Sequence, residues 1–141
     1  MDGSVESVVT GGIATITFGH PKGNSLPAAV LRQLLDEIVA AGRRDDVSVV
    51  ALRSTNEGPF CAGASFDELA AIRETSTGKE FFLGFARVIL AMIRCPKPIV
   101  TRVQGKVVGG GVGLVAASDY ALAAEHADIR LSELAIGIGP F

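Results

Sequence analysis

The stretch PIVTRVQGKVVGGGVGLVAAS, residues 98–118, decides the fold of this chain. Its first part is a β-branched apolar run that predicts a strand, and its last part spaces small and apolar residues as a buried helix does. Between them stand Gly109, Gly110 and Gly111, which permit a positive φ and let a second backbone or a ligand approach closely. The first amides of the helix lack an intrahelical acceptor, so this turn is a potential anion site.

Three interpretations of the turn remain open from this stretch alone. It could bind the pyrophosphate of a dinucleotide, stabilise an oxyanion during acyl chemistry, or simply be a tight strand-to-helix turn packed against its neighbours. The first interpretation has some support, because residues 111–116 fit the pattern GxGxxA and Glu133 follows about twenty residues later.

The flanking sequence predicts an α/β protein with largely parallel strands. A hairpin about Gly11 and Gly12 is expected to open the sheet, and an apolar stripe after Pro27 predicts a helix that Gly42 ends. The run 47–52 is typical of a strand covered on both faces. The remaining expected elements are a short helix from Phe66, a break at 75–78, a helix over 79–94, and strands at 119–123 and 129–131.

The helix over 79–94 should bury one apolar face and end at Cys95-Pro96. Its apolar residues recur at helical spacing, which predicts their burial; they are Phe82, Phe85, Ala86, Ile89, Leu90 and Ile93.

Composition narrows the possible functions. The 141 residues are 48% hydrophobic and 20% charged, which predicts one globular domain, and the net charge of −2 argues against a nucleic-acid partner. No apolar run approaches the ~20 residues that span a bilayer, and no signal peptide is evident, so we expect a cytoplasmic protein without membrane contact. Two cysteines and two histidines, all far apart, predict reduced thiols and no metal site. The apolar ending IGIGPF suggests that a longer protein continues beyond it.

A second turn of small residues, Cys61 to Ser65, also follows an apolar strand and precedes a helix. If the two strands lie near each other, each turn can offer one backbone N–H to the same carbonyl oxygen, which would make a two-donor oxyanion hole. The alternative is that the two turns are unrelated.

Four segments together carry a resemblance to a known family: HPKGNSLP, FCAGASFDEL, VQGKVVGGGVGLVAASDY and SELAIGIGP. In this order they resemble the crotonase (enoyl-CoA hydratase/isomerase) superfamily. The resemblance implies a crotonase-like (ClpP/crotonase) spiral of ββα units, with residues 1–141 as the N-terminal core domain of a longer member, truncated before the C-terminal helical region. It also implies an acyl-CoA substrate, no separate cofactor, and a homotrimer or homohexamer for the full-length protein.

The resemblance assigns roles to particular residues. Ala64 and Gly110 would donate their backbone N–H groups to the thioester oxygen, and Glu133 would be a catalytic acid–base group. The position of a second family glutamate holds Gly113. The residues that would border the coenzyme A and acyl pocket are Ser25, Leu26, Ala62, Ser65, Phe66 and Asp67. Ser65 stands where the family often has Asp, and it can cap the helix that follows.

These roles favour a hydratase acting on a short or branched 2-enoyl-CoA through an enolate held in the backbone oxyanion hole. A double-bond isomerase with Glu133 as its sole acid–base group also fits, because isomerisation only moves one proton between carbons. The sequence is compatible as well with a dinucleotide-binding module or with a non-catalytic protein of the same fold. We expect apolar neighbours to bury the Glu133 carboxyl; those expected are Leu131, Leu134 and Ile136.

Overall fold

The computed structural model describes residues 3–139, so both ends of the predicted 1–141 domain lie outside the described residues. Strands and helices alternate along most of the chain, as the sequence predicted. In chain order the elements are β1 (Ser4–Thr10), β2 (Ile13–Gly19), α1 (Ala28–Arg43), β3 (Val49–Ser54), α2 (Phe66–Ala71), α3 (Thr75–Arg94), β4 (Ile99–Val103), β5 (Val107–Val108), α4 (Gly110–Ala116), β6 (Tyr120–Ala123), β7 (Ile129–Arg130) and a 3₁₀ turn (Glu133–Ile136).

The main sheet has the strand order β1-β2-β3-β4-β6. Only the opening hairpin, β1 with β2, is antiparallel, and the later pairs are parallel. A second, two-stranded parallel sheet joins β5 to β7. The predicted α/β architecture with largely parallel pairing is therefore confirmed.

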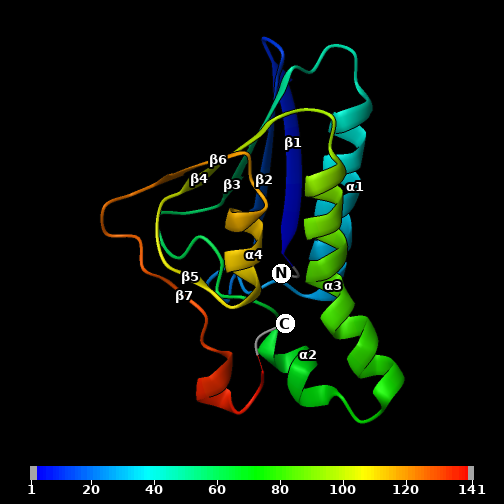
Figure 1. The fold of residues 1–141 in the computed structure, drawn as a ribbon, viewed down its shortest axis with the longest axis vertical. Helices are drawn as coiled ribbons and strands as arrows, with labels where there is room; N and C mark the ends of the chain where they lie inside the picture. Colours follow the sequence, from blue (N-terminus) through cyan, green and yellow to red (C-terminus); the bar gives the residue numbers. More distant parts are fainter. Residues whose placement is uncertain (1–2, 140–141) are drawn as a thin grey trace.

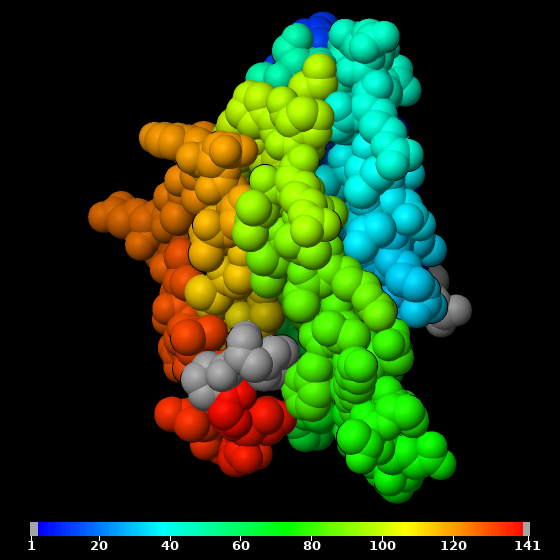
Figure 2. Space-filling model, turned by 45° about the vertical axis from the view of Figure 1, so that its right-hand side comes forward, coloured from blue at the N-terminus to red at the C-terminus, as the bar shows by residue number. Residues whose placement is uncertain are grey.

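Helix α1 packs against β1, β2 and β3, α3 lies beside α1, and α4 packs against α3 (Figure 1). The surface view agrees, with α3 between α1 and α4 (Figure 2). The core lies between helices and sheet, where alternate strand residues such as Ile16, Phe18 and Leu52 are buried. The strand predicted over residues 47–52 is present as β3, but its second face is not fully covered, since the intervening Val49 and Ala51 are only partly buried.

Helix α3 corrects two predictions. It begins at Thr75, so the predicted break at 75–78 is its first turn, and Gly78 is buried with Ile72 Cγ2 3.4 Å from where a Cβ would lie. This packing overrides the weak helix propensity of Thr, Ser and Gly. The buried face holds Phe85, Val88 and Met92. Ala86, Leu90 and Ile93 are exposed instead, because the helix turns the other of its two overlapping apolar stripes toward the core.

None of the helices within residues 3–139 has both the length and the apolar character to cross a membrane.

Candidate active site

The two small-residue turns meet at one place in the structure. Val108 donates its backbone N–H to Cys61 O at 2.9 Å, and Cys61 pairs with Val107 as an isolated parallel bridge. Gly63 has a φ of +88°, and a Cβ on it would lie 3.2 Å from Val108 O and 3.8 Å from Gly110 N. The backbones therefore approach closely because Gly63 has no side chain.

Each turn presents one free backbone amide. Leu26 donates to Gly63 O at 2.8 Å and accepts from Ser65 N at 3.1 Å, which turns the N–H of Ala64 away from that pairing. Gly110 is the first residue of α4, where an amide has no intrahelical acceptor. Among residues 3–139, neither amide donates a hydrogen bond to another protein group. Both are available to an oxygen atom from outside.

Glu133 begins the 3₁₀ turn, and its carboxylate lies against the glycine turn. Its Oε1 is 3.3 Å from the position that a Cβ on Gly109 would take. Its Oε2 is buried and has no hydrogen-bond partner within the part of the chain that is described. A buried carboxylate oxygen without a partner is costly in a protein used only as a scaffold, and it marks a place where a ligand or water can bind.

The expected apolar neighbours of this carboxyl are found in part. Leu131 and Ile136 each line a cavity that Glu133 also lines, although they are 61% and 55% exposed, whereas Leu134 is 77% exposed and lines neither cavity. On another side, the carboxylate lies against the backbone at Gly109.

A cavity of about 430 Å³ joins these groups. Seven of the residues predicted for the site line it: Ser25, Ala62, Ala64, Phe66, Asp67, Gly110 and Glu133. At its rim, the ammonium of Lys22 forms an exposed ion pair with Asp67. The structure thus brings most of the predicted site together, and the roles of these residues stay predictions.

Two predicted pocket residues lie elsewhere. The side chain of Leu26 is fully buried in the core, because its backbone pairing with Ala64 turns the side chain inward. Ser65 is 7% exposed and caps α2, where its Oγ accepts a hydrogen bond from Glu68 N at 3.4 Å. Both residues support the turn from outside the cavity.

A second cavity, of about 510 Å³, adjoins the first and shares Gly109, Gly110 and Glu133 with it. Its other walls are mostly apolar side chains of α3 and α4, including Phe85 and Ile89. A Cβ on Gly113 would lie 2.5 Å from Ile89 Cδ1, so an apolar side chain fills the space beside residue 113. Among the described residues, two carboxylates line these cavities, Asp67 and Glu133, and Asp67 is paired with Lys22. Glu133 is therefore the only one of the two without an ion pair.

Sequence reasoning missed Asn24, which holds the loop before α1. It is 2% exposed with a φ of +56°, its Nδ2 donates to Pro59 O at 2.9 Å and Thr55 O at 3.1 Å, and its Oδ1 accepts from His20 N at 2.8 Å. The signal was present, because Asn between Gly23 and Ser25 is typical of a turn that needs a positive φ.

Glu68 was also missed. Its Oε2 accepts a hydrogen bond from Ala28 N at 2.9 Å, so a carboxylate on α2 caps the first turn of α1. No local pattern could reveal this contact, because the two residues are 40 positions apart.

Other chemistries find less support. Burial raises the pKa of the Cys61 thiol to about 12, so this cysteine is not a nucleophile at neutral pH. Within residues 3–139, no three His, Cys, Asp or Glu residues are grouped as metal ligands.

Gly111, the first glycine of the GxGxxA pattern, packs against Cys61. A Cβ on Gly111 would lie 2.8 Å from the Cβ of Cys61. That glycine serves the core rather than a pyrophosphate, and we set the dinucleotide interpretation aside.

Comparison with known proteins gives an independent result. The family model described as enoyl-CoA hydratase/isomerase matches residues 9–141. The (7aS)-7a-methyl-1,5-dioxo-2,3,5,6,7,7a-hexahydro-1H-indene-carboxyl-CoA hydrolase of Rhodococcus jostii (strain RHA1) is 35% identical over 123 residues, which are 87% of this chain and 47% of that protein. The mitochondrial 3-hydroxyisobutyryl-CoA hydrolase of Gallus gallus is 31% identical over 134 residues, which cover 92% of this chain and 34% of that protein.

Solved structures agree with these matches. The crystal structure of enoyl-CoA hydratase from Bacillus anthracis superposes with a TM-score of 0.88 at 27% identity, covering 99% of this chain and 54% of that one. The chain thus spans about half the length, or less, of the curated relatives that it matches.

Proposed function

Because this chain belongs to the enoyl-CoA hydratase/isomerase (crotonase) family and has its fold, we propose that the protein acts on acyl-CoA thioesters with Glu133 as its only acid–base group. One observation carries the proposal. The unpartnered Oε2 of Glu133 belongs to a residue that lines the same cavity as the free amides of Ala64 and Gly110. A carbonyl oxygen held by the two amides would therefore lie close to a carboxylate that can accept a proton.

Hydrolysis of the thioester fits this arrangement best. Glu133 removes a proton from water while the water oxygen bonds to the thioester carbon, and the negative charge develops on the oxygen held by Ala64 and Gly110. The C–S bond then breaks, the coenzyme A thiolate leaves, and the proton on Glu133 passes to the solvent or to the thiolate. A thiol has a pKa of about 8.5, so the thiolate can leave without a second acid. One carboxylate is therefore sufficient.

Hydration of a 2-enoyl-CoA is the second candidate, and the description of the matching family model favours it. It asks more of the site, because the enolate carbon must receive a proton after water has lost one. Gly113 supplies no second carboxylate for that step, so Glu133 would have to carry the proton from one atom to the other. Double-bond isomerisation by Glu133 alone is a further outcome that the same assay detects.

The remaining expectations stay proposals. The reaction as written needs no cofactor apart from the coenzyme A of the substrate. Assembly as a homotrimer or homohexamer and a cytoplasmic location, both expected from the sequence, are carried forward unchanged.

The test uses the full-length protein that contains this chain, with three substrates. A saturated short branched acyl-CoA reports hydrolysis through release of free thiol, a 2-enoyl-CoA reports hydration through loss of the absorbance of its conjugated double bond, and a 3-enoyl-CoA reports isomerisation through gain of that absorbance. We expect thiol release to be the main activity, and Glu133→Gln to abolish it.

The matched control is Glu125→Gln, which changes an exposed carboxylate outside both cavities and should leave turnover unchanged. Hydration without thiol release would replace the first candidate by the second. No turnover of any of the three thioesters, or full activity in Glu133→Gln, would refute the proposal and favour a non-catalytic protein of this fold.

A further inference from the structure

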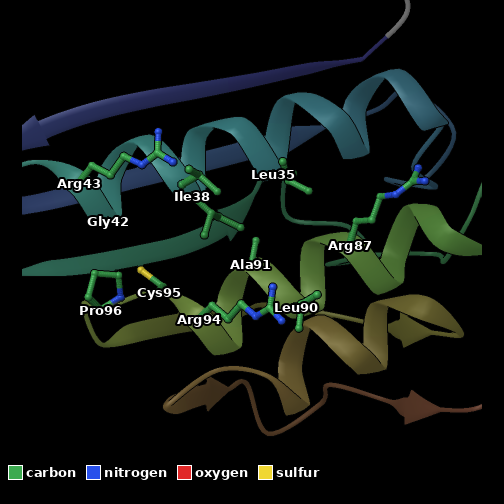
Figure 3. Close-up of a pocket in the computed structure, with 11 residues that line it drawn as sticks. Leu35, Ile38, Gly42, Arg43, Arg87, Leu90, Ala91, Arg94, Cys95 and Pro96 are labelled. Carbon is green, nitrogen blue, oxygen red and sulfur yellow. The ribbon is translucent and has the colours of Figure 1, made fainter.

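A third cavity lies between the C-terminal halves of α1 and α3, away from the candidate active site (Figure 3). Its volume is about 410 Å³; it shares no lining residue with the cavity that contains Ala64, and it shares only Leu90 with the second cavity. We call it the α1–α3 groove. Its walls are apolar and come from both helices: Leu35, Ile38 and Val39 from α1, and Leu90 and Ala91 from α3.

Three arginines border this apolar groove in a protein whose net charge is negative. Arg87 is already paired, because its two terminal nitrogens donate to the carboxylate of Glu80 at 2.8 and 3.1 Å. Arg43 and Arg94 have no ion pair with any carboxylate among residues 3–139. The groove therefore combines an apolar interior with two unpaired guanidinium groups.

The direction of the two unpaired side chains matters. Arg43 and Arg94 occupy the last turns of α1 and α3, where a cation would ordinarily stabilise the exposed carbonyls of the helix end. Figure 3 shows both side chains extending back along their helices, Arg43 toward Ile38 and Arg94 toward Leu90. This is the usual lean of helical side chains toward the N-terminus. The guanidinium groups thus lie along the groove rather than beyond the helix ends.

We propose that the α1–α3 groove binds a medium-chain carboxylate, with the alkyl chain against Leu35 and Leu90 and the carboxylate between Arg43 and Arg94. Ligand sites in proteins are typically apolar clefts of this size with a few charged groups that orient the ligand. A guanidinium matches a carboxylate with two parallel hydrogen bonds, so a carboxylate head group suits a rim of arginines. The negative charge of the ligand complements the positive charge of the two arginines. The proposed binding does not involve the candidate active site.

Cys95 supplies a natural reporter. It lines the groove and is half-buried, while Gly42 on α1 approaches so closely that its Cβ would lie 3.2 Å from Cys95 Sγ. Cys61 is fully buried, with a thiol pKa raised by burial to about 12, so it does not compete for an alkylating reagent. The alkylation rate of Cys95, measured by mass spectrometry of its peptide, therefore reports occupancy of the groove.

The experiment measures this rate in the full-length protein with decanoate, 1-decanol or decyltrimethylammonium, each kept below its micelle concentration. At a decanoate concentration of about ten times its Kd, mass action predicts roughly tenfold slower alkylation. The alcohol should protect far less at the same concentration, and the cation should not protect. The double variant Arg43→Gln/Arg94→Gln should lose the preference for decanoate over decanol. Arg102→Gln, which removes an exposed arginine on β4, is the matched control and should keep it.

Three results would overturn the proposal. Equal protection by decanol would show that the arginines contribute nothing, and unchanged protection in the double variant would show the same. Negligible alkylation of Cys95 without any ligand would show that another segment of the full-length protein or a second copy covers the groove. Because the readout does not involve turnover, failure here leaves the proposed activity unaffected, and failure of that activity leaves this proposal unaffected.

Discussion

Gly110→Ala tests whether the packing of α4 against α3 holds the amide that we place in the oxyanion hole. A Cβ on residue 110 would lie 2.7 Å from Cγ and Cδ2 of Phe85 and 2.9 Å from its Cδ1. Phe85 is 5% exposed and belongs to the core, and although it borders the second cavity, the contact falls on Cγ at the root of the ring, so rotating the ring in place does not relieve it. The substitution must therefore displace either the ring or the first turn of α4.

The structure allows the size of the effect to be worked out. Forcing one extra carbon into a packed core costs about 1–3 kcal/mol. Alanine returns about 1 kcal/mol through its higher helix propensity, so the net loss of unfolding free energy should be at most about 2 kcal/mol. Moving an oxyanion donor out of hydrogen-bond range lowers kcat by about 10²–10³. We therefore expect an activity loss far larger than the fraction of protein unfolded can explain.

Gly113→Ala is the matched control on the same helix. Its Cβ would lie 2.5 Å from Ile89 Cδ1, the end of a flexible side chain beside a cavity, so a rotation of Ile89 relieves the contact. Its unfolding free energy should stay within about 1 kcal/mol of the wild type, since helix propensity offsets the cost of that rotation.

The assay combines urea unfolding with acyl-CoA turnover of the full-length protein at saturating substrate. Turnover of Gly110→Ala within a factor of a few of the wild type would refute the role of this amide. Equal losses in both variants would show that the packing argument fails to separate the two glycines.

Three further predictions concern the supports of the site. Asn24→Ala should lower the unfolding free energy by about 2–4 kcal/mol, because it leaves backbone carbonyls unpaired and puts alanine at positive φ. A loss below about 1 kcal/mol, measured by urea unfolding, would contradict the importance of the Asn24 hydrogen bonds. Ser65→Ala should cost about 1 kcal/mol by removing the cap of α2, whereas Ser65→Thr should retain most of it; equal unfolding midpoints for wild type and Ser65→Ala would exclude a capping role. Burial keeps the pKa of the Cys61 thiol at about 12 against 9.0 in its ordinary state, so stability should fall as the pH rises from 9.0 toward 12. A Cys61→Ala variant should lack that part of the decline, and an identical pH dependence of unfolding in the two proteins would disprove it.

Local patterns predicted the elements of this fold well where one physical requirement dominates. The glycine pair at 11 and 12 demanded a turn, and the hairpin of β1 and β2 formed around it. Apolar runs near 50 and 100 became neighbouring parallel strands, which places the turns that follow them on the same edge of the sheet. The convergence of the two turns was therefore predictable from sequence order and strand pairing together.

The failures occurred where two local solutions were nearly equal and tertiary contacts chose between them. In α3, residues 82, 85, 89 and 93 form one apolar stripe, while 85, 88 and 92 form another, and the packing of α3 between α1 and α4 buries the second. The surroundings of Glu133 were predicted in part. Two of its sequence neighbours, Leu131 and Ile136, line the same cavities as Glu133, but its approach to the backbone of Gly109 joins residues 24 positions apart, and no local pattern indicates such a contact.

The predictable parts of the site are positioned by the backbone and its glycines, whereas the parts that could not be predicted are formed by side chains from separate elements. The two amides are positioned by backbone hydrogen bonds and by glycines whose missing Cβ atoms permit contact: a Cβ on Gly63 would lie 3.2 Å from Val108 O, and one on Gly111 would lie 2.8 Å from Cys61 Cβ. Such steric requirements can be recognised in the sequence, because only glycine satisfies them. The cavity walls are side chains from separate elements, such as Phe66 and Phe85, and many apolar residues satisfy the same packing. If the proposed activity holds, a substitution at Gly63 or Gly111 should abolish turnover of every acyl-CoA tested, whereas one at Ile89 should change the relative turnover of acyl-CoA substrates that differ in their acyl group.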